Sequence, residues 1–509
     1  MQCNVSTIYI LSLGYLLLPV LLFFLTWLRF EVGIAAFVLL LAGAYSAYRH
    51  IRTLIPGSLE LGWEHGVTAF LVFAFLLCTG NCGFFGATGV DIACRDAIYA
   101  DLIRYPWPVI YEESGAILTY YLFFWLVPAG ISSALGLGWS GSHVALFAWM
   151  YVGLLLTVWL LGDVLQARRG KLVFVCLLFL FWSGLNLLGM LPKSVFAKTP
   201  LQIDDYPGYN SWAFTGGEVG GYRMDYFIRT TFDGIANVYN QFISVCLGTV
   251  CFLRLQNRPS LFAFLGLLIL PYSPCGFIGM FAVLTGMAAE AVWRRESRLR
   301  EWVSPVNLCA SFAILPVLYG YFFLNRQAVG TSAGVWYAPL EAYTLTRIGI
   351  LILYYGLYFG VYLWLLDSSI RKTAIWRWLL LVLCVVPFFR VGKAGDFSWN
   401  ASMGPYFILM VLVGKTLLLA WERRCFWGRS LVLAVLLGIA AMTPLMQFTT
   451  SLRACALERK MAVYLDRDGY HGSLANLPTE DLQNFLAMGC EDSWFYKYVL
   501  KHNRPMRAE

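Results

Sequence analysis

Three aspartates follow one another at five-residue intervals in a polar stretch of the chain, GATGVDIACRDAIYADLIRYPWPVIYEE, residues 86–113. Asp91, Asp96 and Asp101 stand there together with Arg95. A carboxylate can take a proton from an attacking hydroxyl or hold a divalent cation against a phosphate, and an arginine beside it can bind the anion. We therefore predict Asp91, Asp96 and Asp101 as catalytic residues, Asp91 as a possible metal ligand, and Arg95 as a substrate-binding residue. The plainer interpretation of any single acid is a helix cap.

Further polar side chains stand in other polar loops and at the ends of apolar runs. Arginine and lysine can bind phosphate, and amides can bind sugar hydroxyls. The additional candidate substrate-binding residues are Arg223, Arg229, Asn240, Gln241, Arg390, Lys393 and Asp396. Asn186 is a similar polar group. Each of them alone is also typical of an interfacial side chain or an interhelical hydrogen bond, so the convergence of acids and bases on one face is what favours a site.

The elements that must position these residues are membrane helices. The 509 residues are 59% hydrophobic and only 13% charged, which is more apolar surface than a soluble core can bury. The formal net charge of +8 is spread over short tracts between apolar runs. Membrane topology explains this charge, and we expect no nucleic-acid partner. The cysteines show no C-x-x-C spacing, which argues against a cysteine metal or redox framework.

Runs of about 20 apolar residues indicate helices that cross a bilayer. We place candidate spans near residues 8–29, 33–48, 66–86, 171–190, 237–253, 305–324, 345–366, 376–390, 404–421 and 430–446. The stretch 116–165 should hold either one crossing plus a re-entrant piece or three short crossings. The stretch 260–293 should cross twice through two short helices. The expected total is therefore 13 or 15 spans.

The charges of the connecting loops predict which side of the membrane each loop occupies. By the positive-inside rule, the basic loops are cytoplasmic. They are RHIR at 49–52, RRGK at 168–171, Arg254 with Arg258, RRESRLR at 294–300, RK at 371–372 and ERRCFWGR at 422–429. The long acid-containing loops would lie outside, at 86–115, 191–236, 325–344 and 391–403. This scheme gives a cytoplasmic N-terminus and an extracytoplasmic C-terminus.

These patterns predict an all-α polytopic membrane protein with two parts. Residues 1–446 should form the transmembrane bundle and its outer loops, and residues 447–509 a small extracytoplasmic cap with a helix at LPTEDLQNFL. In the first outer loop we expect an amphipathic helix that begins at Asp91, ends at Pro106 and lies flat on the membrane surface.

One outer loop and several spans resemble a group of poorly characterised bacterial polytopic membrane proteins. The stretch LCTGNCGFFGATGVDIACRDAIYADLIRYPWPVIY carries the resemblance, and FWSGLNLLG, NVYNQFISV, YSPCGFIGM and DFSWNASMGPYFILM follow it in order. The layout of that group is similar to the GT-C glycosyltransferases, in which a many-helix bundle carries a catalytic carboxylate on its first large outer loop. The resemblance implies Asp91 as the base or metal ligand, Asp101 as a second acid, and polyprenyl-phosphate sugars as donors. Cys94, Asn186 and Asn400 depart from the group's pattern.

We therefore expect an enzyme that moves a hexosyl or pentosyl group from a polyprenyl-phosphate donor to a glycolipid or cell-envelope glycan. It would work at the outer face of a bacterial inner membrane, with a divalent cation such as Mg or Mn as a possible cofactor. The expected partners are the lipid bilayer, the lipid-linked donor and the acceptor. The alternatives are a transporter or flippase of a lipid-linked saccharide, and an oligosaccharide polymerase or ligase.

Overall fold

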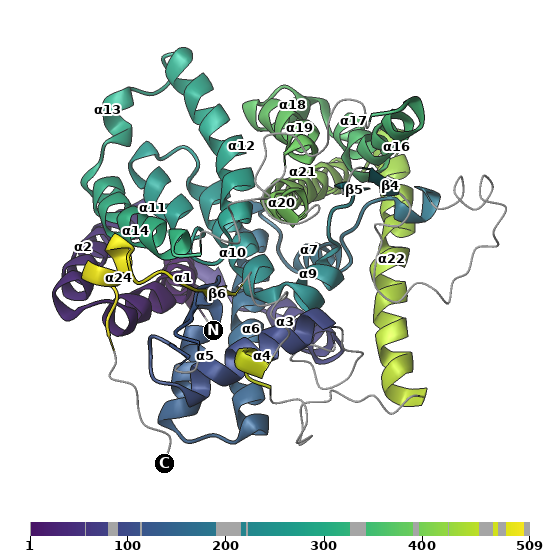
Figure 1. The fold of residues 1–509 in the computed structure, drawn as a ribbon. Helices are drawn as coiled ribbons and strands as arrows, with labels where there is room; N and C mark the ends of the chain where they lie inside the picture. Colours follow the sequence, from purple (N-terminus) through teal and green to yellow (C-terminus); the bar gives the residue numbers. More distant parts are fainter. Residues whose placement is uncertain are drawn as a thin grey trace.

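The protein is a helical bundle with three two-stranded sheets (Figure 1). The computed structural model describes residues 2–55, 58–79, 90–111, 114–189, 215–219, 222–325, 343–389, 396–425, 427–457, 472–476 and 485–502. The longer helices are α1 (Val5–Trp27), α2 (Phe30–Leu54), α3 (Trp63–Leu77), α4 (Val90–Arg104), α5 (Phe123–Ala134), α6 (Trp139–Val164), α7 (Gly170–Leu180), α10 (Tyr239–Leu255), α12 (Pro274–Trp293), α14 (Pro305–Phe323), α16 (Leu345–Tyr355), α19 (Ala374–Val385), α21 (Met403–Glu422) and α22 (Arg429–Leu457).

Short elements connect these helices. The short helices are α9 (Thr231–Asn237), η3 (Pro259–Leu261), α11 (Phe262–Leu267), α13 (Leu299–Trp302), η5 (Gly356–Gly360), α17 (Val361–Leu365), α18 (Ser368–Arg371), η6 (Val386–Phe388), α20 (Asp396–Ala401), η7 (Leu474–Asn476) and α24 (Trp494–Tyr498). The strands are β1 (Gln2–Asn4), β2 (Ser58–Glu60), β3 (Ile117–Leu118), β4 (Thr215–Val219), β5 (Tyr222–Asp225) and β6 (Leu486–Ala487). They pair antiparallel as β1 with β2, β3 with β6 and β4 with β5.

Length and composition make the chain an integral membrane protein. Among the residues that the structure describes, 8 helices are long and apolar enough to cross a bilayer. They are Val5–Trp27, Phe30–Leu54, Trp139–Val164, Pro274–Trp293, Pro305–Phe323, Leu345–Leu365, Asp396–Glu422 and Arg429–Arg453. Four shorter apolar helices accompany them: Trp63–Leu77, Phe123–Ala134, Gly170–Leu180 and Ala374–Phe388. The all-α polytopic class is confirmed, and the total of 13 or 15 spans stays a prediction.

Helix α10 forms the centre of the bundle. Every residue from Tyr239 to Leu253 is buried, and the helix contacts α1, α5, α6, α9, α11, α12 and α21. In Figure 1, α1, α2 and α14 group on one side of α10, and α22 stands at the opposite edge. Because neighbouring helices enclose α10, its buried polar side chains are surrounded by other protein groups.

Polar caps fix where several helices begin. Ser273 and Ser304 accept hydrogen bonds from the amides of Gly276 and Asn307, and in both cases a proline follows at the first helical position. Thr230 caps α9 in the same way, through the amide of Asp233. These caps satisfy amides that have no partner inside the helix, and a proline at the first position loses no hydrogen bond there.

The predicted cytoplasmic loops gather on one face of the bundle, here called the basic face. Ion pairs connect them: Arg254 Nε lies 3.0 Å from Asp163 Oδ2, Lys171 Nζ lies 2.8 Å from Glu422 Oε1, and Arg423 Nη1 lies 2.8 Å from Asp367 Oδ2. The tyrosine hydroxyl of Tyr9, near the start of α1, also bonds to Asp163 at 2.9 Å. The start of the chain and the basic loops therefore share one face.

The first outer loop and the C-terminal segment meet on the opposite face, here called the acidic face. Residues 485–502, here called the C-terminal clasp, pair with chain segments far away in sequence. Strand β6 pairs with β3, Leu28 pairs with Leu500, and the amide of Arg29 donates to the carbonyl of Val499 at 2.8 Å. The clasp thus joins the end of α1 to the segment that follows α4.

Several predicted boundaries differ from the structure. The predicted span 171–190 is the 11-residue α7, because the chain turns after Leu180, and the amide of Leu185 bonds to the carbonyl of Leu357. In 116–165 the 12-residue α5 precedes one long helix, α6, so the alternative of three short crossings is wrong, and that α5 is a re-entrant piece stays a prediction. In 260–293 the prediction of two short helices is wrong, because α11 has 6 residues and α12 has 20.

The predicted C-terminal cap also differs from what the structure shows. The division after residue 446 falls inside α22, which continues to Leu457. The predicted helix at LPTEDLQNFL lies almost wholly outside the described residues, and its last residue but one, Phe485, leads into strand β6.

Candidate functional site

Helix α4 carries the three predicted catalytic aspartates. It begins at Val90 and ends at Arg104, as the sequence predicts, but it does not lie on the surface. The residues from Arg95 to Leu102 are all buried. Helix α5 packs along one side of α4, and η7 contacts it as well. The prediction of a flat surface helix is therefore wrong, because a distant part of the chain covers the side that local sequence assigned to water.

Asp101 ties α4 to the C-terminal part of the chain. Its side chain is fully buried, and Oδ2 accepts hydrogen bonds from the Tyr111 hydroxyl at 2.6 Å and from the amide of Leu474 at 2.9 Å. Burial raises the pKa of the Asp101 carboxyl, and the hydrogen bonds from Tyr111, Leu474 and Ser473 lower it by less. This geometry is that of a structural anchor, because Oδ2 of Asp101 already accepts two hydrogen bonds from the protein itself.

Asp96 is a second buried acid on α4. Its side chain is 2% exposed, and among the described residues its Oδ2 has no hydrogen-bond partner. Burial raises the pKa of the Asp96 carboxyl well above its usual range, and the neighbouring Arg95 guanidinium lowers it by less. Arg95 itself is buried. The direction of this shift favours the protonated form of the carboxyl, which can donate a hydrogen bond.

The three aspartates of α4 do not all point into one pocket. Residues five apart on an α-helix are separated by about 140° around its axis, so Asp96 and Asp101 project from different sides of α4. Asp91 lies in the first turn of α4, and its side chain lies outside the described residues. Its predicted roles as catalytic base and metal ligand stay predictions.

A buried charged cluster stands on the short helix α9. Arg229 Nη1 lies 2.9 Å from Asp233 Oδ2, and the side chains of both residues are at least nine-tenths buried. The amide of Asn237 donates to Asp233 Oδ1 at 2.6 Å, and the Thr230 hydroxyl donates to Gln447 Oε1 of α22 at 2.8 Å. Taking such charges out of water is costly. A charged pair kept inside an apolar bundle is by default a candidate for function.

Aromatic rings enclose the Arg229 guanidinium. Its central carbon lies 5.6 Å from the ring centroid of Phe227 and 6.0 Å from that of Trp399, and these two rings pack 4.4 Å apart. Trp399 belongs to α20, whose first residue is the exposed Asp396. The structure therefore brings two predicted substrate-binding residues, Arg229 and Asp396, to one part of the molecule through α20.

The predicted amides Asn240 and Gln241 lie beside this cluster, in the first turn of α10. Gln241 Oε1 accepts a hydrogen bond from Ser273 Oγ at 2.8 Å, which links α10 to α12. Asn240 is fully buried, and within the described part of the chain neither its oxygen nor its nitrogen has a partner. Asn186 is buried in the same way. Buried amides are normally hydrogen-bonded, so these two are suited to bind water or the hydroxyls of a polar ligand.

Sequence reasoning missed the tyrosines that surround this region. Tyr406 and Tyr362 pack against Trp182, with ring centroids 5.1 and 5.3 Å away, and the amide of Thr231 in α9 bonds to the Trp182 carbonyl. The Tyr362 hydroxyl donates to the carbonyl of Ser183. These residues come from apolar runs in which a tyrosine is typical of an interface anchor, so no local signal placed them around a common centre.

The end of α3 packs against the same cluster. Phe75, near the end of α3, packs against Phe232 of α9 and Phe448 of α22 with ring centroids 5.7 and 5.9 Å away. The chain then runs from Thr79, which is buried, to the start of α4 at Val90. The described end of α3 therefore packs beside α9 and α22.

The side chains of the remaining predicted site residues lie outside the described part of the structure. Arg223 stands opposite Glu218 in the β4 and β5 hairpin, but its side chain is outside the described residues. Arg390 and Lys393 also lie outside them. Among the described residues, no group of three or more His, Cys, Asp or Glu side chains is arranged to hold a metal ion.

The surface hollows do not coincide with the predicted site. Three hollows formed by the described residues have volumes of about 440, 320 and 530 Å³, and all three lie on the basic face. None of the three is lined by a predicted site residue. No protein-family model, curated protein or solved structure matches this chain.

Proposed function

We propose that the protein is a membrane glycosyltransferase that moves a sugar from a polyprenyl-phosphate donor to a glycolipid or glycan acceptor at the acidic face. The buried Arg229 and Asp233 pair is the observation that supports this proposal most. It stands in an apolar bundle, beside the buried amide of Asn240, which has no hydrogen-bond partner among the described residues. A lipid-linked sugar phosphate needs a cation for its phosphate, amides or phenols for its hydroxyls, and apolar surroundings for its tail.

In the proposed reaction the acceptor hydroxyl attacks the anomeric carbon of the donor sugar. The new carbon–oxygen bond forms as the bond from that carbon to the phosphate oxygen breaks. The hydroxyl proton passes to a carboxylate, for which Asp91 is our candidate, and the polyprenyl phosphate leaves with its charge facing Arg229. Asp233 keeps the guanidinium in place, and Asn240 is positioned to bind a sugar hydroxyl. A bound Mg or Mn ion would add further charge at the phosphate.

We also propose that the basic face is cytoplasmic and that the acidic face is extracytoplasmic, as in a bacterial inner membrane. The support is the separation of charge between the two faces. The ion-paired basic loops gather at one end of the bundle, and α4 with the C-terminal clasp lies at the other. Positive loops stay preferentially in the cytoplasm during insertion.

The experiment compares single carboxylate-to-amide variants in cells whose own copy of the gene has been deleted. Asp91→Asn should lower the amount of one envelope glycolipid by about 100-fold or more, the usual size of an acid–base contribution. Asp233→Asn should lower the same glycolipid as well, because the Arg229 guanidinium then loses the carboxylate that holds it in place. Mass spectrometry of extracted glycolipids measures this amount. Asp492→Asn is the matched control, because Asp492 is exposed and pairs only with Lys497 in the described chain.

Expression and thermal unfolding of each variant separate a chemical defect from a folding defect. Unchanged glycolipids in both Asp91→Asn and Asp233→Asn, with normal expression, would remove the basis of the proposal.

Transport of a lipid-linked saccharide is the second candidate function. The observation that favours it is a pair of polar side chains on α10, Asn240 and Ser244, which lie one turn apart inside the bundle and have no hydrogen-bond partner for their side-chain amide and hydroxyl among the described residues. Transporters hold polar groups at such depths. The purified protein in detergent distinguishes the two functions, because a micelle has no second compartment. A new glycosidic product there supports transfer, and its absence with saturating donor and acceptor supports transport.

A further inference from the structure

Two of the hollows on the basic face form one continuous groove. They share the lining residues Gln256, Asn257, Met287, Thr373 and Ala374. Their volumes are about 440 and 530 Å³. The ends of α6, α10 and α12 and the start of α19 surround the groove, together with α21. We call it the basic-face groove, and it lies on the face opposite to the α4 aspartates.

The groove carries more positive charge than the neighbouring acids neutralise. Its cations are Arg254, Arg294, Lys372, Arg377 and Lys415. Arg254 pairs with Asp163, and both Arg294 and Arg377 pair with Glu290. Lys372 and Lys415 form no ion pair with any described residue, and one further acid, Glu296, lines the groove. Two lysines therefore remain available to an anion.

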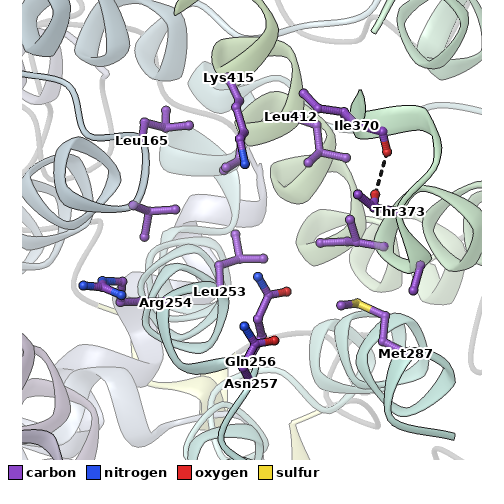
Figure 2. A pocket seen from close by; sticks show the side chains of 14 residues that line it. Leu165, Leu253, Arg254, Gln256, Asn257, Met287, Ile370, Thr373, Leu412 and Lys415 are labelled. Atoms are coloured by element: carbon purple, nitrogen blue, oxygen red, sulfur yellow. Dashed lines mark hydrogen bonds between the residues drawn. The ribbon is translucent and has the colours of Figure 1, made fainter. Parts of the chain in front are cut away.

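Lys415 enters the groove from an apolar helix. Figure 2 shows its side chain extending from α21 towards the space beside Leu253 and Gln256. Lys415 lies seven residues before Glu422, which is about 10 Å along a helix that rises 1.5 Å per residue. This places the backbone of Lys415 inside the end of a candidate span, and its exposed side chain can hold the ammonium group at the level of a lipid phosphate.

The walls around Lys415 are mostly apolar. Leu165, Leu253, Ile370 and Leu412 surround its side chain in the same hollow. Of the other polar groups in this hollow, Arg254 is paired with Asp163 and the Thr373 hydroxyl donates to the Ile370 carbonyl. Asn257 and Gln256 remain, and Gln256 Oε1 is a buried oxygen without a hydrogen-bond partner in the described chain. A site for a free, strongly hydrated anion would need several polar donors, whereas an apolar wall with a cation at its mouth fits an amphiphile with a charged head.

We propose that the basic-face groove binds an anionic phospholipid of the adjoining leaflet. The headgroup phosphate contacts Lys415, and Lys372 at the other end of the shared segment adds a second positive charge. The first part of an acyl chain lies against Leu165, Leu253 and Leu412. This site is independent of the proposed glycosyl transfer, since none of its residues belongs to the acidic face.

The test measures how much phosphatidylglycerol stays bound to the purified full-length protein. Native mass spectrometry is carried out after exchange into detergent containing equal amounts of phosphatidylglycerol and phosphatidylcholine with identical chains. The wild-type protein should retain phosphatidylglycerol preferentially. Lys415→Gln should lower the bound phosphatidylglycerol by about fivefold, the effect of one basic side chain near a lipid surface. Lys372→Gln should lower it as well, and Lys415→Arg should preserve it.

Arg300→Gln is the matched control, because Arg300 is exposed in the basic segment 294–300 on the same face but does not line either hollow. It removes the same charge and should leave lipid binding unchanged. The proposal would be overturned if the wild type and Lys415→Gln bind equal amounts of phosphatidylglycerol while thermal unfolding shows that both proteins are folded. Inorganic phosphate provides a second decision: if millimolar phosphate displaces the lipid completely, the site recognises a free anion and the acyl wall contributes nothing. Retention of the lipid in that buffer supports the amphiphile.

Discussion

At the scale of single residues, the predicted acids of α4 turned out to differ sharply in their surroundings. Asp101 is an anchor with two hydrogen bonds to its Oδ2, whereas Asp96 is buried with an unbonded oxygen. The sequence places both residues on one helix, and that much was predictable. The burial of Asp101 was not predictable, because its carboxylate bonds to the amide of Leu474, 373 positions away in the chain.

Asp101 should make stability depend on pH in a defined direction. Burial raises its pKa in the folded protein, so the folded chain binds more protons than the unfolded chain between the two pKa values. The stabilisation from this group is largest below the unfolded pKa and falls as pH rises through the folded pKa. The amide side chain of Asp101→Asn does not titrate, so this loss of stability is absent from the variant. We therefore expect its unfolding temperature to rise relative to that of the wild type as pH increases from about 4 to 8.

The measurement is thermal unfolding of both proteins in one detergent across that pH range. Asp492→Asn provides a control of opposite sign. The hydrogen bond from Lys497 lowers the pKa of Asp492, so the wild type should gain slightly over that variant as pH rises through the acid range. The difference in unfolding temperature, Asp101→Asn minus wild type, should increase with pH, and a difference that stays constant or falls as pH rises would contradict the assignment.

At the scale of elements, two helices meet without room for a side chain. Gly279 of α12 lies so close to the carbonyl oxygen of Ala401 in α20 that an added Cβ would overlap it. Gly279→Ala must push α20 away from α12 and should destabilise the protein by about 1–3 kcal/mol, as overpacked cores do. Since α20 also carries Trp399, the same change should weaken the packing around Arg229.

Gly438→Ala is the matched control for Gly279→Ala. Gly438 is exposed on α22, and an added Cβ meets nothing within 4 Å. Because alanine favours a helix over glycine, this variant should be neutral or more stable by up to about 1 kcal/mol. Chemical unfolding in mixed micelles measures both variants. Similar losses in the two proteins would show that the α12 and α20 contact is not the cause.

Long helices were predictable because their apolar runs are continuous. The structure has α1, α2, α14, α21 and α22 close to the predicted spans, and Ser304 with Pro305 marks the start of α14 in the sequence itself. Elements whose fate depends on distant partners were less predictable. The i, i+4 spacing of Arg229 and Asp233 is visible in the sequence, but their distant neighbours are not. Trp399 packs near Arg229, and Gln447 and Trp182 accept hydrogen bonds from the adjacent Thr230 and Thr231.

At the scale of the whole molecule, basic loops and the C-terminal clasp occupy opposite faces, and the proposed orientation can be tested directly. A reporter phosphatase that is active only outside the cytoplasm, fused after residue 509, should be active. The same reporter inserted after Ser297, in the basic segment between α12 and α13, should be inactive. Immunoblots normalise for expression. The reverse pattern would invert the orientation, and with it the placement of Asp91 outside the membrane.

The pairing of Leu28 with Leu500 has a consequence for biogenesis. The backbone groups of Trp27 and Arg29 find their partners in Val499 and Lys501, so the first hairpin stays unfinished at one end until nearly 500 residues have been synthesised and the last of them has reached the same side. Folding of the first two helices is therefore completed only after the C-terminal clasp has been synthesised. A truncated chain that lacks the clasp leaves the backbone groups of Trp27 and Arg29 without these partners and is expected to be degraded.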